Sequence, residues 1–172
     1  MPIKTINSDG TLIVTPIGSE TVNLRVTNET VGSYTTADSS YTNTSSVETI
    51  SALTIPVTNG GIYVVEFRSQ LSIANAVHNI KFAMDDGSAT AVFAKTEWTF
   101  ASGGTTLTVL GTALTDVISG GAATAWTSVL MRGLVKFSAG GVLLIMAAQA
   151  SAGLSTSSVL AHASLKATRI GG

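Results

Sequence analysis

Residues 126–149 read WTSVLMRGLVKFSAGGVLLIMAAQ, and this stretch decides the fold. In its first part, residues 126–137, apolar side chains recur at odd positions, and the two cations fall on even positions. Its second part, residues 142–149, begins with seven apolar residues in a row. Because a strand alternates its side chains between two faces, this second strand needs cover on both faces. We predict a hairpin turning at residues 138–141, with the second strand covered by the protein's own core and by another copy of the chain.

The remaining sequence continues the strand pattern in both directions. Apolar residues alternate with polar ones, and turn-forming residues such as Asn-Gly-Gly (59–61) and Asp-Asp-Gly (85–87) recur at short intervals. The second of these turns predicts a hairpin. Short strands at this spacing indicate an all-β fold, an antiparallel jelly-roll β-sandwich of about eight strands. The expected strands are 47–57, 62–71, 79–84, 91–100, a short one around 107–109, 126–137, 142–149 and 159–170.

The N-terminal residues form a separate pattern. Residues 8–27 predict two short strands around a Pro-Ile-Gly-Ser turn, and an isolated hairpin of this kind is only marginally stable in water. We therefore assign residues 1–30 to an anchoring arm, 31–46 to a connector or a loosely paired edge, and 47–172 to the jelly-roll domain. The apolar residues expected to anchor the arm on a partner are Ile3, Ile6, Leu12, Ile13, Val14 and Ile17.

Composition excludes several classes of function. Charged residues make up 11% of the chain, against about 25% in an average soluble domain, and mean hydropathy is +0.42. No run of about 18 apolar residues exists to span a bilayer, so these values favour extensive protein–protein burial over a membrane partner. The net charge of −1 offers no attraction for nucleic acid.

The absence of cysteine excludes disulfides, thiol chemistry and a cysteine zinc site. The first residues lack the apolar segment of a secretion signal. We therefore expect the chain to fold in a reducing cytoplasm.

Candidate catalytic residues are few. His78 and His162 are the only histidines, and neither has a carboxylate placed nearby in sequence for a triad or a metal site. Asp85 and Asp86 precede a glycine between two strands, a pattern more typical of a turn than of paired catalytic acids or a calcium site. We expect no enzyme, no cofactor and no metal. A ring of His162 side chains around a symmetry axis is the alternative that would bind an ion.

The last strand has many small side chains, among them Ala161, Ala163 and Ala167. Small residues permit close approach of backbones. Two arrangements satisfy this: a strand packed tightly inside one sandwich, or a strand beside a threefold axis.

Two stretches resemble a known family. Residues 50–67, ISALTIPVTNGGIYVVEF, resemble the early strands of tumour-necrosis-factor-like jelly rolls, in which a glycine turn precedes a Tyr-x-Val-x-Phe strand. Residues 133–149 and 158–170, GLVKFSAGGVLLIMAAQ and SVLAHASLKATRI, resemble the closing strands of that fold. They are also similar to the jelly-roll heads of tailed-phage virion proteins. The stretch from residue 8 to 27 resembles the N-terminal hairpins of phage head and fibre proteins.

This resemblance implies a homotrimer with its C-terminal strand near the axis and its N-terminal segment docked on the particle. The chain would be a knob of the capsid-decoration or head-fibre type, assembled in the host cytoplasm and displayed on the virion surface. Its partners would be itself and the major capsid protein or another virion protein. The residues expected at the trimer interface are Leu144, Met146, Ala161, Ala163 and Leu165.

Two other functions remain open. A receptor-binding tip of a phage tail or fibre would recognise a cell-surface glycan through exposed aromatic residues. Tyr34, Tyr41, Trp98 and Trp126 are the candidates, although both tryptophans are more typical of a core or an interface. A bacterial surface or spore-coat protein of the same fold is disfavoured by the missing export signal.

Overall fold

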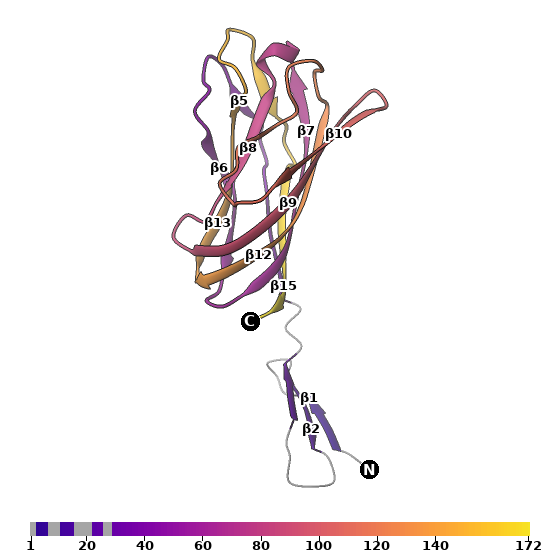
Figure 1. Cartoon of the computed structure of the whole chain (residues 1–172), viewed down its shortest axis with the longest axis vertical. Coiled ribbons are helices and arrows are strands. Elements are labelled where there is room, and N and C mark those ends of the chain that lie inside the picture. The colour runs from indigo at the N-terminus through magenta and orange to yellow at the C-terminus, as the bar shows by residue number, and fades with distance from the viewer. Residues whose placement is uncertain (1–2, 7–10, 16–21, 26–28) are drawn as a thin grey trace.

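The computed structural model describes residues 3–6, 11–15, 22–25 and 29–172 (Figure 1). Strands occupy most of these residues, and the one helix among them is the three-residue 3₁₀ turn η1, Ala76–His78. None of the described helices is long enough to cross a membrane. The strands form three antiparallel sheets, two of which face each other as a sandwich.

The larger sheet of the sandwich contains eight strands. Its central strand β7 (Ile62–Ile73) pairs with β12 (Ser128–Ala139) on one side, followed by β9 (Thr90–Ser102) and β10 (Thr105–Gly111). On its other side β7 pairs with two short strands in succession. These are β15 (Ser164–Gly171), which pairs with β4 (Thr30–Tyr34), and β14 (Ser157–Val159), which pairs with β5 (Ser39–Tyr41).

The smaller sheet contains four strands and covers the apolar face of the larger one. Their order is β11 (Ile118–Ser119), β8 (Ile80–Asp85), β13 (Gly141–Gln149) and β6 (Glu48–Val57). Successive strands from β6 to β9 alternate between the two sheets, and so do β11, β12, β13 and β14. This path confirms the jelly-roll β-sandwich that the alternation pattern predicts, with twelve strands in its two sheets where about eight were expected.

The predicted hairpin of residues 126–149 is wrong. β12 lies in the larger sheet and β13 in the smaller one, so the chain turns a corner of the sandwich at Gly140. A Cβ atom on Gly141 would lie 2.3 Å from the backbone nitrogen of Ala89, so only glycine fits this corner. The turn at residues 85–87 likewise joins the two sheets and is not a hairpin. The hairpin in this region is β9–β10, which turns at Gly103-Gly104.

The core between the two sheets is aromatic at its centre. Phe82 of the smaller sheet stacks on Trp98 of the larger one, with ring centroids 5.7 Å apart. Phe67 packs against both rings, at 5.4 Å from Phe82 and 6.1 Å from Trp98. The structure thus confirms that both tryptophans belong to the core. Trp98 is buried and Trp126 is 4% exposed, so neither is open to a ligand.

Residues 30–41 belong to the sandwich. β4 and β5 pair along β15 and β14, so the segment assigned as a connector contains the outermost strands of the larger sheet. The alternative of a paired edge is the correct one. The larger sheet therefore includes residues that precede Val47, and these cover the outer edges of β15 and β14.

The last strand is interrupted. Residues 160–163 separate β14 from β15, and His162 adopts a positive φ of 66° within this bulge. Backbone bonds from Thr35 to Ala163 and from His162 back to Thr35 hold the bulge to the neighbouring edge. The small side chains of this strand are therefore explained by close packing beside β7 in the same chain.

The third sheet consists of N-terminal strands alone. β1 (Ile3–Ile6), β2 (Thr11–Thr15) and β3 (Val22–Arg25) form an antiparallel meander that pairs with neither sheet of the sandwich. The β2–β3 pair agrees with the predicted hairpin, and β1 is a strand that the sequence pattern did not predict.

Candidate functional site

The two histidines lie in different parts of the fold, and the Asp38 carboxylate near His162 accepts from the backbone N–H of Ala161 at 2.7 Å. His78 lies in η1, where its Nδ1 donates to the carbonyl oxygen of Ser151 at 3.0 Å. His162 is exposed in the bulge between β14 and β15. Within the described residues no three His, Asp or Glu side chains gather as a metal site would require.

The paired aspartates have structural partners. Asp85 Oδ1 accepts from the backbone N–H of Gly87 at 2.6 Å, and Asp86 Oδ2 accepts from that of Ala91 at 2.8 Å. Both carboxylates thus hold the corner between β8 and β9. This is the turn role that their position before Gly87 predicts.

Two buried amides were missed by sequence reasoning. The amide of Asn79 donates to the carbonyl oxygens of Gly121 and Thr124 at 2.9 and 2.7 Å. Gln149 accepts from the backbone N–H groups of Thr44 and Gly153. Both side chains are completely buried, so they fix the loops at one end of the sandwich and offer nothing to a ligand.

The five predicted interface residues do not form one surface. Leu144 and Met146 are half-buried on the outer face of β13, whereas Ala161 lies in the bulge of the larger sheet. Ala163 and Leu165 are core residues with 0% and 1% exposure. These two cannot contact another copy while the sandwich is intact.

The predicted anchor residues fall into two alternating rows of the N-terminal sheet. The register places Leu12 opposite both Ile6 and Leu24, and Val14 opposite Val22. Ile13 stands opposite Thr5 and Asn23, and Ile3 opposite Thr15, in the other row. Ile17 lies outside the described residues.

The outer face of the larger sheet carries a row of charges that sequence reasoning missed. The register aligns Glu97, Arg132, Glu66 and Lys166 across β9, β12, β7 and β15. Alternation predicts that each residue faces outward, but only the strand pairing shows that the four lie side by side. Alternating charges across neighbouring strands support this pairing.

Glu66 is the centre of the row. Its two oxygens accept from the Nε of Arg68 at 2.8 Å and from the Nε of Arg132 at 3.1 Å. The bond from Arg68, followed by that from Arg132, lowers the pKa of the Glu66 carboxyl below its usual value. One carboxylate therefore orients two guanidinium groups on a face otherwise open to solvent.

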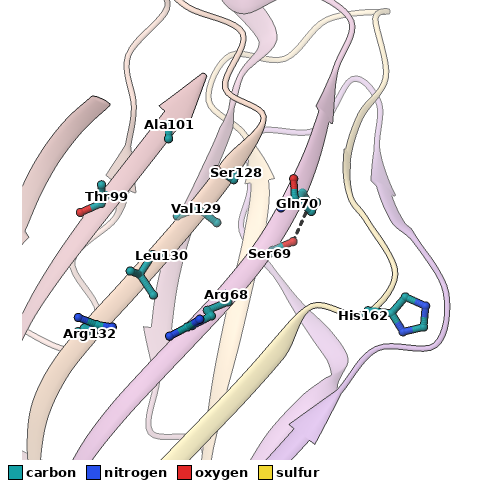
Figure 2. Close-up of a pocket in the computed structure, with 10 residues that line it drawn as sticks. All are labelled: Arg68, Ser69, Gln70, Thr99, Ala101, Ser128, Val129, Leu130, Arg132 and His162. Atoms are coloured by element: carbon teal, nitrogen blue, oxygen red, sulfur yellow. Dashed lines mark hydrogen bonds between the residues drawn. The ribbon is translucent and has the colours of Figure 1, made fainter. Parts of the chain in front are cut away.

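A hollow of about 510 Å³ lies beside these arginines, over the ends of β9, β12 and β7 (Figure 2). Its lining contains two arginines and no acidic residue. In Figure 2 the ring of His162 points away from Arg68, so the charge of the hollow comes from the arginines. The lining residues are Arg68, Ser69, Gln70, Thr99, Ala101, Ser128, Val129, Leu130, Arg132 and His162.

The loops at the opposite end from Gly172 lack the exposed aromatic cluster that a receptor-binding tip would need. Residues 42–47, 74–79 and 150–156 contain no Tyr or Trp, and Trp126 of the adjoining loop is buried. The exposed tyrosine is Tyr34, at 65%, on the edge strand β4. Aromatic stacking of a glycan at this end is not supported by the described residues.

Comparison with known proteins identifies no relative of this chain by sequence. No protein-family model and no curated protein matches the chain. A chain of infectious bursal disease virus, Gx strain, is 12% identical with a TM-score of 0.19, over 98% of this chain and 50% of that one. A chain of the Gt strain is 11% identical with a TM-score of 0.19, over 96% and 50%. This chain spans half the length of those it matches, and similarity at this level carries no argument about function.

Proposed function

We propose that the chain is a structural protein of a virus particle: a jelly-roll knob that assembles as a homotrimer and docks on the particle through its N-terminal sheet. The observation that carries the proposal is that, among the residues the structure describes, β1–β3 pair only with one another. A sheet reaches stability by packing a second layer on its apolar face, and three strands of four or five residues offer only one layer.

The register gives this sheet an apolar row for docking. Ile6, Leu12 and Leu24 align across its three strands, and the next row of the same alternation consists of Lys4, Val14 and Val22. Burial of such a row against a partner stabilises the contact by about 1.5–3 kcal/mol for each large aliphatic side chain. The major capsid protein, or another virion protein, would supply the second layer.

The proposed trimer contact lies on the outer face of the smaller sheet. Val142, Leu144 and Met146 remain half-buried there, and the register places Leu144 between Thr54 and Asp85, and Met146 beside Ala83. A second copy would complete their burial. Among the predicted interface residues, Leu144 and Met146 are retained in this proposal, whereas the buried Ala163 and Leu165 are not.

The strand path supports the resemblance to tumour-necrosis-factor-like and phage jelly rolls. Its first and last strands, β4 and β15, lie together beside β7, while the middle strands alternate between sheets. The few charged residues of the chain also suit a protein that buries much of its surface in an assembly.

Immunogold labelling tests the location. Antibody raised against residues 29–172 is applied to particles purified from the source culture, and we expect label distributed over the particle head. Label confined to a tail end would instead favour the receptor-binding alternative. Absence of label from the particles would contradict a virion role.

A matched pair of variants tests the docking sheet. Leu12→Lys places a charge in the apolar row, and we expect this variant to be lost from purified particles. Asn23→Lys changes the alternate row and should be incorporated normally. Normal incorporation of Leu12→Lys would show that the apolar row does not dock the chain.

A further inference from the structure

We propose that the hollow on the outer face of the larger sheet binds the carboxylate-bearing pyranose of an acidic glycan. This inference goes beyond the structural role proposed above and does not depend on it. The hollow lies on the larger sheet, and the proposed trimer contact lies on the smaller one. Both can therefore be occupied in the same molecule.

The guanidinium groups of Arg68 and Arg132 are oriented for an anion. Each is held through its Nε by Glu66, and no partner is found for their terminal nitrogens among residues 29–172. A guanidinium fixed at Nε still presents terminal N–H donors in a plane, which suits the two oxygens of a carboxylate. Both side chains are about 60% exposed, so a ligand reaches them without rearrangement of the fold.

The charge balance favours one negative group. Glu66 and Glu97, which stands opposite Arg132, balance two of the three neighbouring cations Arg68, Arg132 and Lys166, so one positive charge remains on this face. One ligand carboxylate would compensate the remaining cation. A neutral sugar would leave this charge unmatched, so the acidic ligand should bind better.

The rest of the lining suits a sugar ring. Gln70, Thr99 and Ser128 offer amide and hydroxyl groups for hydrogen bonds to ring hydroxyls. Leu130 lies on β12, two residues before Arg132 and opposite Arg68 of β7, and provides an apolar surface for the face of the ring (Figure 2). The volume of about 510 Å³ lies within the roughly 300–1,000 Å³ range of small-molecule pockets.

Titration of the full chain, followed by amide chemical shifts, tests this proposal. The probes are glucuronic acid, N-acetylneuraminic acid, glucose and inorganic sulfate. We expect both acidic sugars to shift the signals of Gln70 and Leu130, with affinity at least about tenfold above that of glucose. The better of the two acidic sugars indicates whether the natural glycan carries a uronic or a sialic acid. Equal binding of glucose, or sulfate binding as tightly as both acidic sugars, would overturn the proposal.

Variants assign the binding to the two arginines. Arg68→Gln and Arg132→Gln should each weaken binding of the preferred acidic sugar about tenfold or more. Arg132→Lys keeps the charge but loses the planar donors, so it should bind with intermediate affinity. Lys136→Gln removes an exposed cation of the same strand outside the hollow and should bind as the parent does. Unchanged affinity in both Arg→Gln variants, with their unfolding temperatures unaltered, would exclude this site.

Discussion

Tyr41 is the residue whose ionisation is most affected by the fold. It ends β5 with 6% of its surface exposed. Burial raises the pKa of its phenol to about 12, the charge of Glu48 adds to this rise, and a hydrogen bond with Ser39 opposes it. The native state therefore keeps Tyr41 neutral at pH values where an unfolded chain would ionise it.

This shift predicts alkaline destabilisation that depends on Tyr41. A raised native pKa contributes stability in full below the unfolded value of 10.0, and that contribution is lost as pH rises toward 12. The unfolding temperature of the parent should thus fall more steeply between pH 9 and 11 than that of Tyr41→Phe. Thermal unfolding across this range measures it, and parallel curves for the two proteins would contradict the assignment.

At the scale of elements, alternation identified the strands but not their partners. Tyr63, Val65 and Phe67 point inward and Glu66 and Arg68 outward, as the period of two predicts. The turn residues, however, fit both a hairpin and a corner between sheets. Whether β13 pairs with β12 or β6 depends on contacts distant in sequence, so the predicted hairpin was wrong although both of its strands exist.

The corner before β13 yields a prediction about Gly141. In Gly141→Ala the new Cβ would lie 2.3 Å from the nitrogen of Ala89 and 2.4 Å from the carbonyl carbon of Ser88, so backbone must move. We expect a loss of about 1–3 kcal/mol in the free energy of unfolding, measured by denaturant titration. Gly171→Ala is the control, since its nearest neighbour would be Ile62 Cδ1 at 3.6 Å. Similar losses in the two variants would contradict the close approach at the corner.

For the candidate hollow, too, the sequence pattern predicts which residues face outward but not which of them lie side by side. The sequence presents Arg68 and Arg132 as separate outward residues in two strands. Only the register of β7 with β12 places both against Glu66. The buried amides Asn79 and Gln149 gave no sequence signal, because polar residues near strand ends are ordinarily exposed.

For the whole molecule, the boundary of the sandwich can be tested by truncation. Removal of residues 1–28 deletes a sheet that pairs only with itself, so residues 29–172 should unfold within about 2 °C of the full chain. Removal of residues 1–46 also deletes β4 and β5 and exposes the edges of β15 and β14. We expect this shorter chain to unfold at a temperature at least about 8 °C lower, or to aggregate. Equal unfolding temperatures for the two truncated chains would support the domain boundary at residue 47 that the sequence predicts.

The trimer is tested by mass in solution. Light scattering of the full chain at micromolar concentration should give three times the chain mass of 17.5 kDa. Leu144→Lys should shift the mass toward one chain, because it places a charge within the proposed contact. Leu154→Lys, at an 87% exposed loop position, should leave the mass unchanged. A parent mass of 17.5 kDa would exclude the trimer.

On the ribosome, β4 leaves the exit tunnel long before its partner β15 has been synthesised. Val31 pairs with Ala167, and Ala167 in turn with Val65 at the centre of the larger sheet. The β4 edge of the sandwich therefore closes only after residues 164–171 emerge, as is usual for folds dominated by distant strand pairs. A product that stops before β15 lacks the strand that joins β4 to β7. Synthesis of β15 thereby becomes a condition for the native sandwich, and chains that stop short of it are left open to proteases.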